Sequence, residues 1–208
     1  MTRDQIIGRV NIKLEEISDE PGQIIENPLI DEILDETADE LQLMVPRFLL
    51  KAEALIVGDS TTNQVLNADG TGYITLPADF LRLAYFKLEE WAKAVVDPIS
   101  EDHPNYVNQH NIYTRGKPAK PVCVLRYDAE AGTMILEYFS AAIGENETHT
   151  VERAAYIPRR KAEDLQDNLI DPLTWLVVAK VLQIYSADDN AAKNAIEKVA
   201  TWIMLNRR

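Results

Sequence analysis

The chain has 208 residues, of which 46% are hydrophobic and 26% charged, and this composition is typical of a globular protein rather than a disordered one. A chain of this length forms one domain or two small ones and needs no disulfide or metal to complete a core. The single cysteine, Cys123, excludes an intramolecular disulfide and favours a reducing compartment. The formal net charge of -13 argues against a general nucleic-acid coat, because duplex binding requires Lys and Arg to neutralise phosphates.

The distribution of apolar and charged residues also indicates whether the chain spans a membrane and what kinds of partner it could bind. No apolar run reaches the roughly 18 residues that a membrane span requires, and no signal-peptide core follows the N-terminus, so we expect a soluble protein. Residues 14–46 contain no Lys or Arg. This stretch is either a solvated helix face or a surface that meets a basic partner or repels DNA. Its acidic residues are Glu15, Glu16, Asp19, Glu20, Glu26, Asp31, Glu32, Asp35, Glu36, Asp39 and Glu40.

The N-terminal part of the chain has the spacing of amphipathic helices. Apolar residues recur every three or four positions, which predicts a helix over residues 3–17 and a second over residues 27–44. Asn27 is a suitable N-cap for the second helix. Pro46 breaks this pattern, and a further short helix is predicted over residues 48–57.

The middle of the chain, residues 59–160, changes to β-rich runs separated by Gly and Pro. Residues 121–127 and 134–139 flank a short glycine-containing loop and are predicted to form a hairpin. Residues 81–96 fit both a helix and a strand, and the aromatic content favours a strand over 82–88. Further strands are predicted over residues 73–76 and 151–157.

The C-terminal part is predicted to be helical again. A helix over residues 172–185 is apolar on nearly every side, so a single stripe of core contacts does not account for it. A last helix follows the cap formed by Asp188, Asp189 and Asn190. We therefore expect an α+β fold in which N- and C-terminal helices pack as a helical bundle around a central antiparallel β-rich insertion. The expected segments are 1–58, 59–160 and 161–208, the first and last forming one helical domain.

The sequence lacks the common catalytic signatures. It contains no nucleophile elbow, no phosphate-binding loop and no dinucleotide fingerprint. Cys123 lies inside a predicted strand, where an inert buried thiol is expected. No pair among His103, His110 and His149 has the spacing of a helical zinc site. We therefore predict no enzymatic activity, catalytic residue, metal or cofactor.

One loop resembles the start of an EF-hand calcium site. Asn67, Asp69 and Thr71 take the first, third and fifth positions, and Gly72 takes the sixth. The pattern fails at the twelfth position, where a bidentate Glu is required and Ala78 stands. A glycine-rich turn that leads into a strand is therefore the favoured interpretation.

The segment 76–83, Leu-Pro-Ala-Asp-Phe-Leu-Arg-Leu, is the most specific motif in the chain. Pro77 cannot donate to a β-ladder and ends the preceding strand. The segment resembles the signature of head–tail adaptor proteins, also called connector or neck-ring proteins, of short-tailed bacteriophages. Residues 108–122 resemble the matching middle segment in ring proteins of crAss-like phages, and the order of helices, β-rich insertion and helices is similar.

This resemblance implies a structural virion protein that forms a ring of about twelve copies beneath the portal and continues the DNA channel. The implied partners are the portal protein, neighbouring copies, and downstream tail or ring proteins, while DNA passes without specific binding and no membrane is involved. The implied location is the virion neck, after assembly in the cytoplasm of a bacterial host. The alternative is a non-enzymatic interaction module such as an assembly chaperone or tail-completion factor, and a calcium-binding or enzymatic protein is a third class.

Within this interpretation, two groups of residues are candidate sites. An acidic surface suits a channel through which DNA slides without sticking. Its candidates are Glu32, Asp35, Glu36, Asp39 and Glu40. The helix over residues 172–185 has more apolar surface than one packing partner within the chain would cover, and basic side chains are scattered elsewhere. Both features suit contacts with the portal or with neighbouring copies. The candidates for this interface are Phe80, Arg82, Arg115, Trp175, Leu176, Tyr185, Trp202, Arg207 and Arg208.

Overall fold

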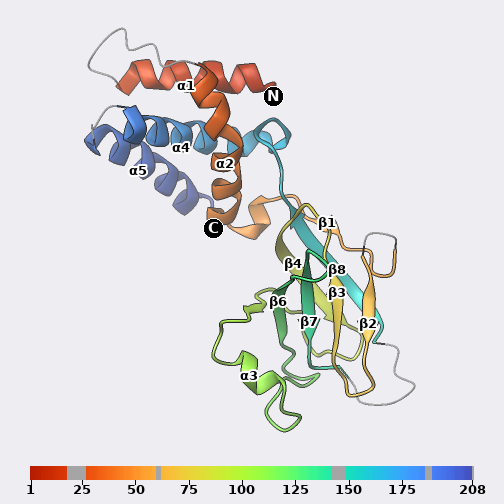
Figure 1. Cartoon of the computed structure of the whole chain (residues 1–208). Coiled ribbons are helices and arrows are strands. Elements are labelled where there is room, and N and C mark those ends of the chain that lie inside the picture. Colours follow the sequence, from red (N-terminus) through yellow and green to blue (C-terminus); the bar gives the residue numbers. More distant parts are fainter. Residues whose placement is uncertain (18–26, 60–61, 142–148, 186–188, 208) are drawn as a thin grey trace. The chain divides into compact units, whose positions relative to one another are not determined.

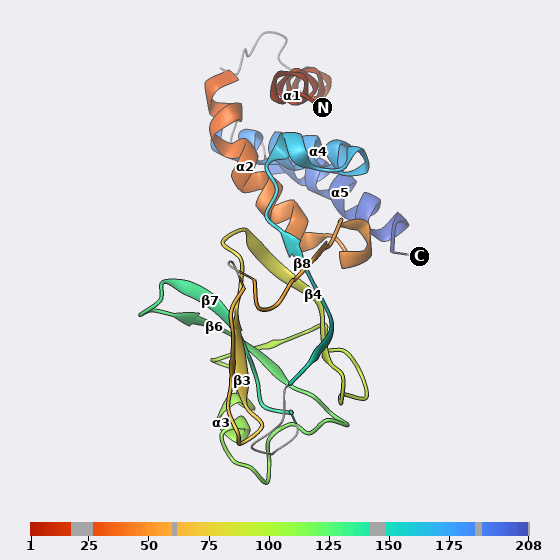
Figure 2. The same ribbon diagram turned by 90° about the vertical axis from the view of Figure 1, so that its right-hand side faces the viewer.

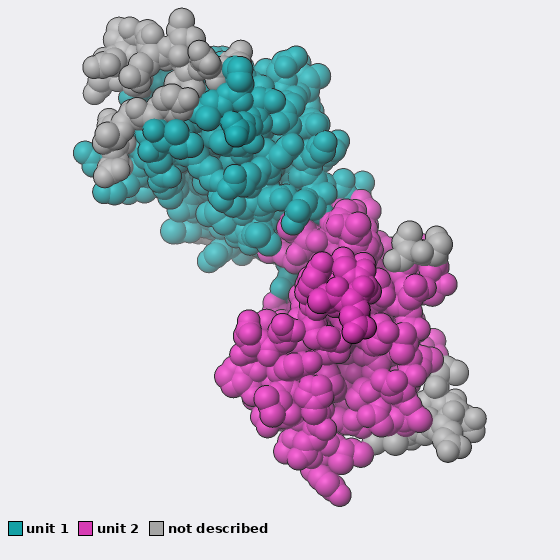
Figure 3. Space-filling model, in the orientation of Figure 1, with its two compact units in different colours: residues 1–51, 159–208 teal, residues 52–158 magenta. Residues whose placement is uncertain are grey.

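The computed structural model describes residues 1–17, 27–59, 62–141, 149–185 and 189–207. The chain divides into two units, which Figure 3 distinguishes by colour. Unit 1 consists of residues 1–51 and 159–208, and unit 2 consists of residues 52–158. Helices occupy both ends of the chain and strands occupy the middle, so the predicted α+β class is confirmed.

Unit 1 is a bundle of four helices with α4 at its centre. The helices are α1 (Arg3–Ile17), α2 (Asn27–Met44), α4 (Asp167–Tyr185) and α5 (Asp189–Leu205), with short 3-10 turns η1 (Arg47–Leu49) and η2 (Ala162–Asp164). Helices α1, α2 and α5 each pack against α4 (Figures 1 and 2). Because three helices surround α4, its apolar residues are buried on nearly every side. They include Leu169, Ile170, Leu173, Leu176, Val177, Val178, Val181 and Leu182.

This arrangement corrects one expectation about α4. Its apolar residues were expected to exceed what the chain itself covers, yet unit 1 buries most of them. Leu176, a candidate interface residue, is only 7% exposed and belongs to the core of unit 1. The helix also begins at Asp167, so Pro172 lies inside it. Proline removes one hydrogen bond near the helix N-terminus, and burial of the flanking Ile170 and Leu173 holds the helix across that point.

The predicted helices at both chain ends are confirmed, whereas the helix predicted over residues 48–57 is wrong. The chain forms only the single turn η1 there and then becomes extended. Residues 53 and 54 form strand β1 (Glu53–Ala54), which pairs with Ala155 and Tyr156. Pairing with a strand about a hundred residues away therefore overrides the local helical spacing.

Unit 2 contains two β-sheets. In the first, β1 and β4 (Phe80–Leu88) both pair antiparallel with β8 (Val151–Pro158). In the second, the order is β2 (Gln64–Leu66), β3 (Gly72–Thr75), β7 (Thr133–Tyr138), β6 (Cys123–Asp128) and β5 (Ile99–Ser100). All neighbours in the second sheet are antiparallel except β5 and β6, which are parallel. The predicted strands over 73–76, 82–88 and 151–157 and the hairpin of β6 and β7 are confirmed within a few residues.

An aromatic cluster forms the centre of unit 2. The Trp91 ring meets Phe86 and Tyr138 edge to face, with ring centroids 5.5 and 6.3 Å apart. Its Nε1 donates a hydrogen bond to the carbonyl of Ser140 at 2.9 Å, so the buried indole has a polar partner. Cys123 packs in the same cluster and is buried.

The thiol of Cys123 is expected to be inert in the folded protein. Burial raises its pKa well above the usual value, so little thiolate forms, and reagents reach it only when unit 2 opens. We expect modification by a thiol reagent at pH 8 to be at least about a hundredfold slower in the native protein than in the urea-unfolded chain. An Ile12→Cys variant supplies an exposed thiol as the control. Equal rates for native and unfolded Cys123 would contradict the burial.

Candidate functional site

The first candidate surface is a groove in unit 1 formed by α1, α4 and α5, here called the tryptophan groove. It has a volume of about 780 Å³. The structure brings together two predicted interface residues there, Trp175 on α4 and Trp202 on α5. The remaining lining residues are Ile17, Asp171, Asn194, Glu197, Lys198, Thr201 and Leu205.

Two lysines hold the Trp175 ring in position. Lys13 Nζ lies 4.2 Å and Lys198 Nζ 3.6 Å from the ring centroid, which are cation–π distances. Lys13 also donates hydrogen bonds to Asp171 Oδ1 at 2.6 Å and to Thr174 Oγ1 at 2.7 Å. Burial lowers the pKa of Lys13, although Asp171 acts in the opposite direction. The groove therefore presents a fixed, amphipathic aromatic side chain, which is the composition of a protein-binding surface.

The second candidate surface is a groove in unit 2 built around the motif 76–83, here called the signature groove. It has a volume of about 790 Å³ and is lined by residues 54–56, 59, 62, 75–80, 127, 132–134 and 156. Phe80 stacks on Tyr156 with ring centroids 6.1 Å apart, and the Tyr156 hydroxyl donates to Asp79 Oδ1 at 3.2 Å. The motif thus forms one wall of an open apolar groove. Arg82, also predicted for the interface, is half-buried on β4.

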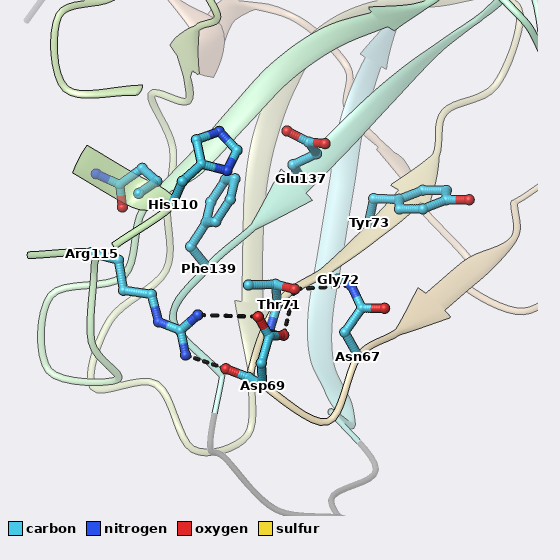
Figure 4. A pocket seen from close by; sticks show the side chains of 10 residues that line it. Asn67, Asp69, Thr71, Gly72, Tyr73, His110, Arg115, Glu137 and Phe139 are labelled. Atoms are coloured by element: carbon cyan, nitrogen blue, oxygen red, sulfur yellow. Dashed lines mark hydrogen bonds and ion pairs between the residues drawn. The ribbon is translucent and has the colours of Figure 1, made fainter. Parts of the chain in front are cut away.

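A third, smaller pocket of about 210 Å³ contains the loop that resembles an EF-hand (Figure 4). Asp69 Oδ1 accepts hydrogen bonds from the Thr71 amide at 3.1 Å and from the Thr71 hydroxyl at 2.7 Å. Arg115 donates to the carbonyl of Asp69, and its Nη1 lies 3.6 Å from Asp69 Oδ2. Burial raises the pKa of Asp69, but the bonds from Thr71 and the charge of Arg115 outweigh it and lower the pKa below its usual value.

These contacts account for the conformation of the loop and for the buried position of Arg115. The guanidinium of Arg115 neutralises the Asp69 carboxylate, and the loop is a turn between β2 and β3 closed by hydrogen bonds between Asn67 and Thr71. No cluster of three metal-ligating side chains occurs among the described residues. Arg115 is buried, so its expected role at a subunit interface is corrected: its partner is inside its own chain.

The opposite wall of the same pocket is also internally paired. Arg126 donates to Glu137 Oε1 through Nε at 3.1 Å and Nη2 at 2.9 Å, and the Tyr106 hydroxyl donates to Glu137 Oε2 at 3.2 Å. The His110 ring packs edge to face against Tyr106 and Phe139. The ionised side chains of this pocket therefore stabilise the fold of unit 2 rather than remain available for a ligand.

The acidic candidates on α2 are largely paired within unit 1. Arg3 pairs with Asp31 and Asp35, Arg159 pairs with Asp39 at 3.2 Å, and Lys180 pairs with Glu36 at 3.5 Å and Glu40 at 2.7 Å. Burial raises the pKa of Asp39. Of the five acidic candidates, Glu32 alone has no ion-pair partner among the described residues, so most of the negative charge of these five side chains is balanced within unit 1.

The remaining candidates lie near the C-terminus of the chain. Arg207 is exposed just after α5. Tyr185 ends α4, but its side chain and all of Arg208 lie outside the described residues, as does Asp188 of the predicted cap. The sequence analysis missed Lys13 and Lys198, because no local pattern links them to Trp175 on another helix.

Comparisons with protein families and with curated proteins identify no relative. No protein-family description matches the chain, and no curated protein is significantly similar to it. No described helix combines the length and the apolar content that crossing a bilayer requires.

Proposed function

We propose that the chain is a structural ring protein of the phage neck, located beneath the portal, where it joins capsid to tail. The observation that carries this proposal is the motif 76–83, which leads from β3 into β4 within a β-rich unit that is inserted between helices that form one bundle. This is the chain order that the resemblance to head–tail adaptors implies. Fold-level similarity alone is a weak argument for function, so the exposed surfaces provide the second part of the argument.

Two grooves support a role in assembly rather than in catalysis. The tryptophan groove presents Trp175 and Trp202, residues of the type that dominate protein interfaces. The signature groove presents Phe80 and Tyr127 in unit 2. A ring requires two different surfaces on each copy, and a docked ring requires one more for the portal. We assign the tryptophan groove to the portal.

The structure distinguishes among the five acidic residues of α2 that the sequence offers as candidates for the surface of the DNA channel. Glu32 and Glu36 are the most exposed acidic side chains among the α2 candidates. Exposed carboxylates keep phosphates from binding, whereas carboxylates paired with Arg3 or Lys180 contribute less repulsion. We therefore propose that Glu32 faces the channel and that DNA passes without a specific contact. Glu36, whose side chain is 72% exposed but lies 3.5 Å from Lys180, contributes a weaker repulsion.

The proposal is tested by mixing the purified chain with the portal encoded beside it and by electron microscopy of the virion neck. A ring beneath the portal, present in purified virions, is the expected result. Absence from virions together with no binding to portal overturns the proposal. Binding to neck proteins combined with absence from virions identifies an assembly factor instead.

Portal binding is expected to depend on Leu205 but not on its neighbour Met204. The two side chains are 68% and 67% exposed at the end of α5, and only Leu205 lines the tryptophan groove. We expect Leu205→Ala to weaken binding to the portal about fivefold, because it removes apolar contact area at the rim of a Trp-containing site. Met204→Ala, the matched control, is expected to bind as the unmodified chain does. Equal affinities for the two variants in a sedimentation assay would remove the groove from the portal contact.

A further inference from the structure

The loop that connects β5 to β6 exposes large apolar side chains. Val107, Ile112 and Tyr113 are 75%, 51% and 86% exposed within the part of the chain that the structure describes. They lie within seven consecutive residues, on and just after the short helix α3 (Tyr106–Gln109). Residues 103–122 are here called the hook loop. Such exposed apolar side chains, grouped on one loop, mark a contact surface.

The hook loop is fixed by hydrogen bonds rather than loosely attached. The buried side chain of Gln109 accepts from the Gly116 amide at 2.9 Å and donates to the Asn105 carbonyl at 3.0 Å. The Thr114 hydroxyl donates to the Asn108 carbonyl at 2.8 Å. At the base of the loop, a Cβ on Gly116 would lie 2.3 Å from Ser140 Oγ, so the backbone there is packed tightly. A preformed loop loses little conformational entropy when its exposed side chains are covered.

The signature groove has complementary properties. Its apolar walls include Ile56, Phe80 and Tyr127, and Ile56 and Tyr127 are exposed. The groove contains Asp59 and Asp79, and its described lining includes no Lys or Arg. Residues 103–122 contain no Asp or Glu, in a chain whose formal net charge is -13, and their exposed basic residues are Lys117 and Lys120, since Arg115 is buried and paired with Asp69. The exposed apolar side chains and the positive charge of the hook loop are therefore complementary to the apolar walls and the negative charge of the groove.

A single copy cannot place its hook loop in its own groove. The base of the loop is tied to Asp69 through Arg115, next to the end of the β3–β7 ladder at which Gly72 pairs with Tyr138. The groove contains residues 75, 76, 133 and 134, at the other end of the same ladder. Figure 1 likewise shows α3 at the end of unit 2 farthest from β1. A hook loop that occupies the groove must therefore belong to a second copy.

We propose that the hook loop of one copy inserts Ile112 and Tyr113 into the signature groove of a second copy. The contact is heterologous, because a surface of one kind meets a surface of another kind, and repetition of it generates a ring or an open filament. As the contact that would hold neighbouring copies together, it rests on the proposed ring function. Lys117 and Lys120 at the base of the loop lie at the rim of the contact and favour the acidic groove.

Cysteine cross-linking between two variants tests the contact directly. One variant carries Tyr113→Cys on the hook loop and the other carries Ala78→Cys in the groove, two exposed positions, while the native Cys123 is buried. We expect a short bifunctional maleimide to give cross-linked dimers in the mixture and a ladder of oligomers with the double variant. Each single variant alone is expected to give few cross-links. Cross-linking in the mixture no stronger than in the single variants overturns the proposal.

A matched pair of substitutions measures the contribution of the loop to self-association. Ile112→Ala is expected to weaken self-association about tenfold in sedimentation velocity runs, because it truncates a side chain at the centre of the contact. Ile12→Ala is the control, since Ile12 is a comparably exposed isoleucine, at 57%, and belongs to α1 of unit 1 rather than to the hook loop. Both variants are expected to keep the circular dichroism spectrum and melting temperature of the unmodified chain. Equal losses in the two variants overturn the assignment of the loop.

The two proposals fail in different ways. Rings that form without hook–groove cross-links overturn the hook contact and leave the neck-ring proposal intact. Hook–groove cross-links in an assembly that stops at a dimer support the contact and overturn the ring, because the contact then closes with two-fold symmetry. A chain that stays monomeric up to about 100 μM overturns the contact, since a stable interface of this kind forms at lower concentrations.

Discussion

Replacing Gly72 with alanine is expected to destabilise unit 2 by about 3 kcal/mol. A Cβ at this position would lie 2.3 Å from the Tyr138 hydroxyl oxygen and 2.6 Å from the Val65 carbonyl oxygen, both well inside contact distance. Neither atom can move away easily. The Tyr138 ring is buried, and its hydroxyl is held by Gln64 Nε2 at 3.0 Å and His149 Nδ1 at 3.1 Å. The backbone of Val65 pairs with β3.

A second glycine provides the control for this substitution. Gly8 lies in the interior of α1, and a Cβ there meets no atom within 4 Å. Gly8→Ala is expected to stabilise unit 1 by about 1 kcal/mol, because alanine has the higher helix propensity. Urea unfolding followed by circular dichroism measures both free energies of unfolding. A Gly72→Ala variant as stable as the unmodified chain would show that Tyr138 is not confined as described.

Truncating Trp91 to alanine is expected to reduce the free energy of unfolding by about 4 kcal/mol. The substitution leaves a cavity beside Phe86 and Tyr138, two rings that pack directly on the indole. It also leaves the Ser140 carbonyl without the Trp91 Nε1 donor in a buried position. Both effects act on the same cluster, in which Cys123 and Leu136 are also buried. Faster modification of Cys123 is therefore expected alongside the loss of stability.

A tryptophan-to-alanine substitution on α5 shows how much of the stability loss at Trp91 is due to burial rather than to the residue type. Trp202 is half-buried at the tryptophan groove, so Trp202→Ala is expected to cost about 1 kcal/mol, well below the cost at Trp91. Urea denaturation of the two variants under identical conditions measures the difference. A loss at position 202 as large as that at position 91 would contradict the half-exposed position of Trp202.

Local patterns were sufficient for most of the elements. The spacing of Ile6, Val10 and Leu14 defines the buried face of α1, and alternation around a glycine-containing loop identifies the hairpin of β6 and β7. The error at residues 48–57 has a non-local cause, because the partner of β1 is β8, which is distant in the sequence. The parallel pairing of β5 with β6 is equally invisible to a short-range pattern.

The candidate site was harder to predict, because it depends on which residues the fold covers. Trp175 and Trp202 attract attention as large aromatic residues, and the structure places them in one groove. Leu176 is chemically similar but points into the bundle, and Arg115 has a partner that only the fold of unit 2 brings near. The exposure of Tyr113 follows from the hydrogen bonds that shape its loop, and no sequence signal distinguishes it from a core tyrosine.

The assembly of unit 1 from both ends of the chain has a consequence for biosynthesis. Helices α1 and α2 leave the ribosome before α4, on which both pack, and the whole of unit 2 is translated between them. Unit 2, which is encoded without interruption, can fold while the N-terminal helices still lack their central partner. A nascent chain that terminates before Asp167 therefore leaves the apolar faces around Val10 and Leu34 uncovered, and chaperones and proteases act on such surfaces.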